Sequence, residues 1–219
     1  MPYKARISVP IIVVAVTIVG MLLYSSTMVP QLLPRTSGLM GEPSTGGLTI
    51  DDVLSVAQDY LEAVGELDLA VAEIMEFSNH FYVDVYEEGR GVHAFELIVE
   101  RDGDVYPEHG PNMMWNTKYG HHGRGMMGRG GMMGTYSESA EMLIDEHESV
   151  DYAQNYLDKH MPGASAVEPH RFYGYYTLHV EADGNIIGML SVNGYDGSVW
   201  YHNWHGEFIQ IIELEHHEE

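Results

Sequence analysis

Methionine and histidine side chains gather in one stretch of the sequence, between residues 109 and 137. The stretch contains neither Asp nor Glu, although the chain has 33 of these residues. Soft thioether sulfur prefers Cu(I), and imidazole binds several transition metals, copper among them. Calcium, magnesium and manganese favour oxygen donors, and this stretch offers no carboxylates. The candidate ligands for a copper ion are His109, Met113, Met114, His121, His122, Met126, Met127, Met132 and Met133.

Glycine is frequent in the same stretch, at seven positions between Gly120 and Gly134. A glycine-rich backbone can bring widely spaced ligands to one ion without steric conflict. A metal-free interpretation is also open, because methionine is a flexible hydrophobe that serves adaptable protein contacts. Lys118, Arg124 and Arg129 would then make the stretch a cationic docking element on an acidic protein, and a plain linker is the third interpretation.

The elements that would carry this stretch occur in two copies. Residues 57–61 (AQDYL) return as residues 153–157 (AQNYL), and DGDVY returns later as DGSVW. Two matches in the same order and at nearly the same spacing indicate a duplication. In each copy a segment with helical periodicity precedes alternating segments typical of strands and an Asp-Gly turn. The first helix is expected between a cap at Thr49 and a stop at Gly65.

This order of one helix, three strands and a terminal Asp-Gly turn resembles the PepSY family. The resemblance covers about residues 48–110 and 138–206, and its carriers are AQDYL with ERDGDVY and AQNYL with GYDGSVW. It implies extracytoplasmic, often membrane-attached units that bind or restrain other proteins and have no catalytic residues. The segment between the copies departs from the family, and its bulky part, residues 111–116, is expected to fold against the first copy.

An uncharged segment, residues 7–29, follows Lys4 and Arg6 near the N-terminus. As a helix it would span about 30 Å, the thickness of the hydrocarbon core of a membrane. Positive charge before it and a long acidic region after it place the N-terminus inside and the bulk of the chain outside the cell membrane. A signal peptide cleaved near residues 25–27 is the alternative.

We therefore predict an α+β fold with two tandem helix-plus-antiparallel-sheet units behind a single transmembrane helix. Its parts are a cytoplasmic N-terminus (1–6), the transmembrane helix (7–29), a linker (30–48), the first PepSY-like unit (49–110), the Met/His/Gly-rich loop (111–137), the second unit (138–206) and an acidic tail (207–219). Neither unit is long enough to hold a large core alone, so the two are expected to pack together.

The chain carries 33 acidic and 10 basic residues, for a formal net charge of −23. Such an acidic surface repels phosphates, which argues against nucleic acid as a partner. The absence of cysteine removes disulfides, thiol catalysis and Fe–S clusters. The sequence also lacks the motifs of serine hydrolases, zinc proteases, phosphate-binding loops and dinucleotide-binding folds, so we predict that the protein is not an enzyme.

The histidines outside the loop are expected to be structural or exposed. His202 and His205 are three residues apart on an expected strand, where their side chains would point to opposite faces of an aromatic edge. Isolated strand positions are expected for His80, His93, His170 and His179, and the acidic tail holds His216 and His217.

The predicted function is the handling of copper outside the membrane, as a chaperone, a buffer or an accessory subunit. One alternative is a metal-free interaction subunit of a membrane or surface complex, with the loop as its docking element. Another is a PepSY-type restraint on a peptidase. Copper is the one cofactor that the residues favour, and a protein partner is expected.

Overall fold

The computed structural model describes residues 47–65, 68–120 and 141–214. The chain divides into two units, Met1–Gln31 and Leu32–Glu219, and all described residues belong to the second unit. The predicted transmembrane segment and most of the Met/His/Gly-rich loop lie outside the described ranges. Among the described residues, no helix is long and apolar enough to cross a membrane.

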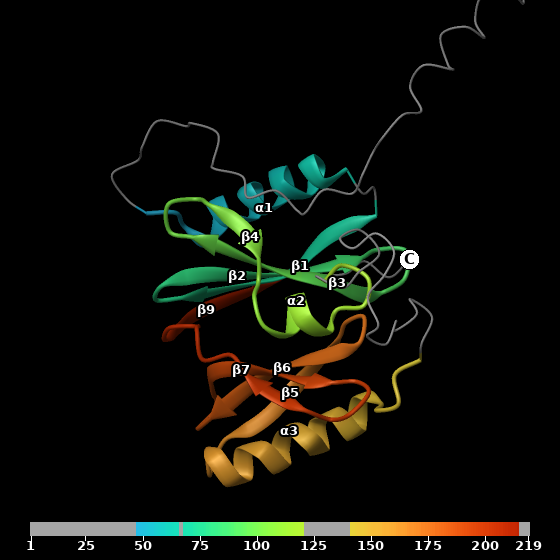
Figure 1. Ribbon diagram of the computed structural model, residues 1–219. Helices are drawn as coiled ribbons and strands as arrows, with labels where there is room; N and C mark the ends of the chain where they lie inside the picture. Colours follow the sequence, from blue (N-terminus) through green and yellow to red (C-terminus); the bar gives the residue numbers. More distant parts are fainter. Residues whose placement is uncertain (1–46, 66–67, 121–140, 215–219) are drawn as a thin grey trace, which may run out of the picture. The chain divides into compact units, whose positions relative to one another are not determined.

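The described residues form helices and two antiparallel sheets (Figure 1), which confirms the predicted α+β class. The elements are α1 (Ile50–Val64), β1 (Leu69–Phe77), β2 (His80–Glu87), β3 (Val92–Glu100), β4 (Val105–Pro107), α2 (Pro111–Trp115), α3 (Glu146–His160), β5 (Ser165–Arg171), β6 (Tyr175–Ala182), β7 (Asn185–Asn193), β8 (Val199–Tyr201) and β9 (Phe208–Glu213).

Both long helices begin with a capping box, in which the cap and the third helical residue exchange hydrogen bonds. Thr49 and Asp52 form this motif at the start of α1, and Gly65 ends the helix in the left-handed conformation with a φ of 76°. The predicted limits of this helix are therefore confirmed. Asp145 and Glu148 form the same motif at the start of α3.

Each long helix covers one face of one sheet. The first sheet has the strand order β4-β3-β2-β1-β9, and the α1 residues Val53, Ala57 and Tyr60 join its apolar core. The second sheet has the order β5-β6-β7-β8, and Ala153 and Leu157 of α3 join its core. The two remaining sheet faces turn towards each other, so the described helices and sheets form helix, sheet, sheet and helix layers (Figure 1).

Strand β9 links the two halves of the chain. It follows the second sheet in sequence but pairs with β1 of the first sheet, where Ile212 lies opposite Ile74. The segment predicted to be an acidic tail from residue 207 thus begins with a strand, and its Phe208 and Ile211 pack against the apolar cluster between the sheets. The first sheet therefore includes, at one edge, a strand from the C-terminal part of the chain.

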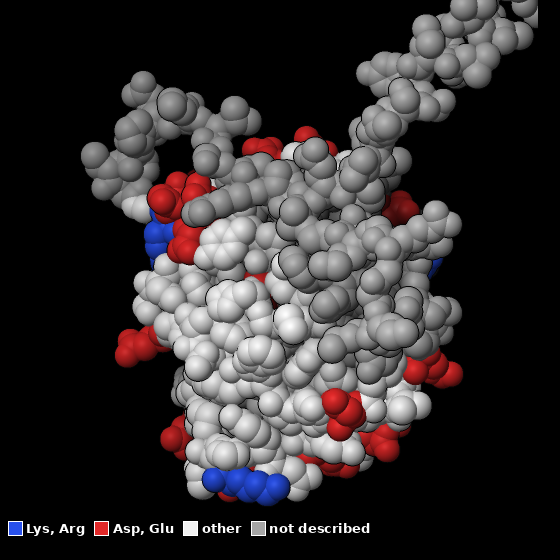
Figure 2. Space-filling view, viewed as in Figure 1, with Lys and Arg blue, Asp and Glu red and all other residues white. Residues whose placement is uncertain are grey.

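Charged residues are unevenly distributed on the molecular surface. Figure 2 shows acidic side chains mainly towards the margins of one face, whereas few charges lie in its middle. Basic side chains are scarce on the same face, in keeping with the composition of the chain. The acidic residues that matter for the site lie inside the molecule.

A row of four carboxylates crosses the inner face of the first sheet, and we call it the acidic row. Glu73 lies opposite Asp84, and Asp84 lies opposite Glu96 in the strand register. Glu108 continues the row, because its backbone N–H donates to the Glu96 carbonyl over 2.9 Å. None of the four residues is more than 3% exposed. Buried carboxylates require partners, and much of the second sheet's inner face supplies them.

Glu96 and its neighbours fix the beginning of the Met/His/Gly-rich loop. The Glu96 carboxylate accepts hydrogen bonds from the hydroxyl groups of Tyr82 (3.0 Å), Tyr175 (2.8 Å) and Thr177 (2.7 Å). The Asn112 amide on α2 donates to the backbone carbonyls of Glu96 (2.9 Å) and Glu108 (3.0 Å). As predicted, this part of the loop folds against the first half of the chain, and it begins directly beside Glu108.

Candidate metal centre

Three of the predicted ligands fall within the described residues. His109, Met113 and Met114 line one open surface depression of about 640 Å³, together with Gly110, Trp200, Asn203 and Trp204. Met114 is 53% exposed, so its thioether is accessible from outside. The other predicted ligands, His121, His122, Met126, Met127, Met132 and Met133, lie outside the described residues. The described ligands therefore share one surface feature, and the remainder of that site stays a prediction.

A buried cluster of one carboxylate and two imidazoles adjoins this depression. Glu108, His202 and His205, which we call the Glu108 centre, each offer one ligand atom within 4.8 Å of the other two. His205 Nε2 lies 3.1 Å from Glu108 Oε1, and His202 Nδ1 lies 3.8 Å from the same oxygen. The side chains are at most 1% exposed. Such a donor set can hold a divalent transition metal.

The Glu108 centre contains polar atoms without an aligned hydrogen bond, although the carboxyl group of Glu96 lies within hydrogen-bonding reach of Glu108. Among the described residues, six buried side-chain N and O atoms have no aligned hydrogen bond, and three of them are Glu108 Oε2, His202 Nδ1 and His205 Nε2. His205 Nε2 is close to Glu108 Oε1 but not aligned for a hydrogen bond with it, and His202 Nδ1 is too far from that oxygen for a hydrogen bond. Leaving buried polar atoms unpaired costs folding free energy. One metal ion could be bound by the Glu108 carboxylate together with both rings, because each of the three residues offers a ligand atom within 4.8 Å of the others.

The other atoms of the Glu108 centre are held in place by neighbours. His202 Nε2 lies 2.9 Å from Ser191 Oγ, and His205 Nδ1 lies 2.7 Å from His80 Nε2. Trp204 Nε1 donates to Glu108 Oε1 over 3.0 Å. Metal-binding imidazoles usually use their second nitrogen in this way, which fixes the orientation of the ring. The second nitrogens are therefore already occupied, and the ligating nitrogens are not.

Burial sets the protonation of the Glu108 centre. It raises the pKa of Glu108 to about 8 and lowers the pKa of His205 to about 3. It also holds the pKa of His202 well below its usual value. At neutral pH both imidazoles are therefore uncharged, which is the form that binds metals, and the carboxyl group would release its proton to an arriving ion.

The local fold explains why His202 and His205 meet, and it corrects the sequence-based expectation for them. Strand β8 ends at Tyr201, and the turn that follows brings both rings to Glu108, so they do not point to opposite faces. The predicted aromatic environment is present. Trp204 stacks on His202 at a centroid distance of 4.6 Å, and Phe77 stacks on His205 at 4.3 Å. The sequence did not predict Glu108 as the partner of these two histidines.

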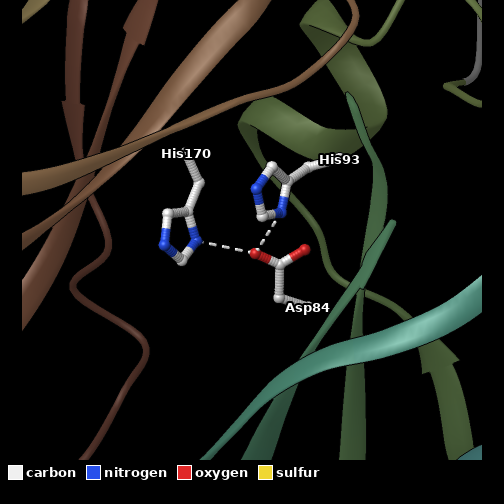
Figure 3. A group of neighbouring side chains, drawn as sticks. All are labelled: Asp84, His93 and His170. Atoms are coloured by element: carbon white, nitrogen blue, oxygen red, sulfur yellow. Dashed lines mark hydrogen bonds and ion pairs between the residues drawn. The ribbon is translucent and has the colours of Figure 1, made fainter. Parts of the chain in front are cut away.

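A second cluster of the same composition lies elsewhere in the acidic row (Figure 3). His93 Nδ1 and His170 Nδ1 lie 2.7 Å and 2.8 Å from Asp84 Oδ2. We call these three residues the Asp84 cluster. Burial would raise the pKa of Asp84, but the two imidazoles hold it at about 2. Burial would likewise lower the pKa of His170, but Asp84 raises it to about 9.

The histidines predicted at isolated strand positions are thus not isolated. His93 and His170 meet at Asp84, and His80 contacts His205. His179 Nε2 lies 3.1 Å from Glu73 Oε1, and His179 Nδ1 lies 2.9 Å from Glu168 Oε2. The expectation treated each strand alone, whereas contacts such as His170 with Asp84 and His179 with Glu73 join residues of opposite sheets.

No protein-family model matches the chain, and neither a curated protein nor a solved structure was found to match it. The resemblance to the PepSY family therefore stays a prediction that rests on the repeated patterns. The chemistry of the buried clusters and of the adjoining depression is the basis for assigning a function.

Proposed function

We propose that this protein handles transition-metal ions outside a membrane, with copper as its preferred ion. The observation that carries the proposal is that the Glu108 carboxyl group meets the rings of His202 and His205, and that Glu108 Oε2, His202 Nδ1 and His205 Nε2 are all buried. These buried atoms have no aligned hydrogen bond among the described residues, and each belongs to a group that binds metals. In a protein that binds no ligand at these atoms, they would be expected to form hydrogen bonds or to be replaced by apolar groups.

Copper is favoured by the combination of two kinds of donor. Two imidazoles and a carboxylate bind several divalent ions, and Cu(II) binds most tightly in the general order of affinities. The thioethers of Met113 and Met114 in the adjoining depression are soft donors that favour Cu(I). Copper is stable as Cu(I) and as Cu(II), so it can bind both to the thioethers of the depression and to the imidazoles and carboxylate of the Glu108 centre.

Trp204 stands between the depression and the Glu108 centre. Its indole ring lines the depression, packs at 4.4 Å from the His109 ring, and donates a hydrogen bond to Glu108. We assign to the depression the capture of the ion and to the Glu108 centre its retention. In this proposal the predicted ligands at 121–133 add to the capture surface, and Trp204 must move aside when the ion passes inward.

The remaining predictions belong to the same proposal. Residues 7–29 would anchor the chain in the cell membrane, and two PepSY-like units would form an extracytoplasmic body. A membrane or surface complex that uses or exports copper would be the partner, with this chain as chaperone, buffer or accessory subunit. The chemistry of the proposed metal site needs no catalytic residue of its own.

A metal-free docking function is the second candidate, and a specific observation favours it. Met114 and Trp200 are 53% and 40% exposed at the same depression. Exposed methionine and tryptophan side chains are typical of adaptable protein contacts. A partner of this kind could be a subunit of a complex or a peptidase under restraint. In that case binding would need the apolar side chains of the depression and would be indifferent to Glu108.

The test is metal titration of the full chain, purified in detergent and stripped of metal with a chelator. Cu(II) and Cu(I) affinities would be measured by competition with chelators of known affinity. We expect Glu108→Gln and His202→Gln each to weaken Cu(II) binding by about 100-fold or more. His147→Gln is the matched control, because the His147 side chain is 89% exposed on α3. Equal Cu(II) affinity in all three variants and the parent protein would contradict the proposal.

A further inference from the structure

The Asp84 cluster differs from an ordinary buried ion pair in the direction of its ring nitrogens. Figure 3 shows both imidazoles presenting Nδ1 to the same carboxylate oxygen, Asp84 Oδ2. The rings of His93 and His170 are stacked at a centroid distance of 4.4 Å and an angle of 10°. One ligand atom from each of the three side chains lies within 4.8 Å of the others. A single ion can therefore be reached by all three.

The cluster also contains unsatisfied atoms. Asp84 Oδ1 and His93 Nδ1 are buried without an aligned hydrogen-bond partner among the described residues. Five of the six atoms of this kind thus belong to the Glu108 centre or to the Asp84 cluster. Tyr60 Oη is the sixth and lies in the core under α1. Five of the six buried atoms without an aligned hydrogen bond therefore lie where imidazole and carboxylate groups meet, although His93 Nδ1 is in ion-pair contact with Asp84 Oδ2.

Two strand irregularities aim the histidines into this cluster. The register of β2 and β3 shifts beside His93, and the register of β5 and β6 shifts between Val167 and His170. Glu168, inside the second irregularity, has a φ of 50°, which is uncommon for a residue with a side chain. Bulges of this kind re-aim side chains and occur at functional sites.

The surroundings of the cluster resemble the outer shell of a metal site. His179 lies beside His170, at a centroid distance of 5.6 Å, and is held by Glu73 and by Glu168. The side chains of His93 and His170 are 17% and 23% exposed, whereas Asp84 is fully buried. An ion could therefore reach the imidazoles from solvent and keep one position for water.

From these observations we propose a second metal site, at Asp84, His93 and His170, for a divalent transition ion such as Zn(II) or Cu(II). Asp84 and His93 lie on β2 and β3 of the first sheet, and His170 lies on β5 of the second sheet. An ion bound here joins the two sheets directly. The site stands on different residues from the Glu108 centre, and its role is to clamp the sheets together, not to hold cargo.

The experiment uses the full chain in the Glu108→Gln background, which removes a ligand of the Glu108 centre. Zn(II) is titrated in the presence of a competing chelator, because thioethers bind Zn(II) poorly. We expect one tightly bound equivalent and a rise in Tm of about 5 °C or more, since the ion binds the folded state. Adding His93→Gln should remove both the equivalent and the rise in Tm, whereas adding His147→Gln should remove neither.

The outcomes separate this site from the proposed function. Loss of all tight Zn(II) binding in Glu108→Gln alone would overturn the second site and leave the Glu108 centre standing. Retention of the equivalent after both His93→Gln and His170→Gln, tested separately, would also overturn it. Near-UV circular dichroism would show whether each variant is folded. If His93→Gln does not fold, the loss or retention of Zn(II) binding in His170→Gln decides whether the site exists. An independent test is the absorption spectrum of Co(II) bound to Glu108→Gln, and a spectrum without the features of imidazole ligands would overturn the site.

Discussion

The Glu108 centre and the Asp84 cluster each combine one carboxyl group with two imidazoles, but at neutral pH the Asp84 carboxyl group is ionised and most of the Glu108 carboxyl group is protonated. Both carboxylates are fully buried, so burial alone does not separate them. At Asp84 two ring nitrogens lie within 2.8 Å of one oxygen, and the pKa of the carboxyl group stays at about 2. At Glu108 the ring nitrogens are more distant or misaligned, and the pKa rises to about 8.

The difference shows that the distance to the imidazole partners, and not the kind of residue, decides whether a buried carboxyl group is ionised. In the metal-free protein the Asp84 cluster is already an ion pair, so an arriving metal ion must displace the proton of His170 before it can reinforce the link between the sheets. The Glu108 centre is uncharged and its ligand atoms have no aligned hydrogen bonds, so the binding of a metal ion should be more favourable there. If both bind metal, the Glu108 centre should therefore bind Cu(II) more tightly than the Asp84 cluster.

The largest expected effect comes from neutralising the two carboxylates in metal-free protein. Asp84→Asn should lower the free energy of unfolding by about 3–5 kcal/mol, because it removes one partner of a buried ion pair. Glu108→Gln should cost less than about 1 kcal/mol, because it replaces a protonated carboxyl group with an uncharged group of the same shape. Urea unfolding at pH 7 with a chelator present measures both. Equal costs would break the comparison.

The metal affinities should show the reverse order. Glu108→Gln, which is almost harmless to the metal-free fold, should weaken Cu(II) binding by about 100-fold, as should His202→Gln. Asp84→Asn should leave the first and tighter Cu(II) equivalent within about threefold of the parent value. Competitive titration of the same protein preparations provides the measurement. A larger loss in Asp84→Asn than in Glu108→Gln would show that the cargo site has been assigned to the wrong cluster.

Glu87, at the end of β2, provides a third carboxylate for the comparison. Burial raises its pKa, but hydrogen bonds from Lys118 (2.5 Å), Tyr119 (2.7 Å) and Tyr173 (2.9 Å) outweigh burial and lower it. Because the folded pKa is lowered, this carboxylate stabilises the fold above its unfolded pKa. That contribution is lost as the pH falls from 4.5 through the folded pKa.

Glu87→Gln should therefore cost about 1–2 kcal/mol at pH 7 and progressively less below pH 4.5. The difference between the parent protein and the variant would be followed by urea unfolding from pH 3 to pH 7. Glu88→Gln is the matched control, because Glu88 is exposed beside it. A cost that stays constant over this pH range would mean that the Glu87 charge contributes nothing.

The smallest effect is expected at the mouth of the depression. Met114→Leu keeps the apolar volume but removes the thioether, so it should weaken Cu(I) binding by about tenfold or less and leave Cu(II) affinity unchanged. Leu143→Met, at another exposed position, is the reciprocal control. An equal loss of Cu(I) and Cu(II) affinity would mean that the depression acts through its shape and not through its sulfur.

Local signals predicted much of the fold. The Thr49 cap, the Gly65 stop and the alternating strands lie close together in sequence, so each could be interpreted alone. Strands β1 and β5 were not among the predicted segments. Strand β9 escaped prediction because its partner, β1, lies more than a hundred residues earlier and the segment ends in acidic residues. Pairing over such a distance leaves no local pattern.

The sites were predictable only in part, for the same reason. His109, Met113 and Met114 could be grouped because they are neighbours in sequence. The Glu108 centre joins residues almost a hundred positions apart. The Asp84 cluster depends on two β-bulges, which the strand propensities of the residues do not predict. One signal was present: Asp84 and Glu96 interrupt strands of apolar residues. An acid in such a strand is rarely buried without a specific partner.

Anomalous diffraction at the copper edge, from crystals of the full chain grown with Cu(II), tests directly whether the Glu108 centre binds copper. We predict a peak within coordination distance of the Glu108 carboxylate, His202 Nδ1 and His205 Nε2, and the loss of that peak in Glu108→Gln crystals. A map with copper elsewhere, and none between these three side chains, would contradict this prediction.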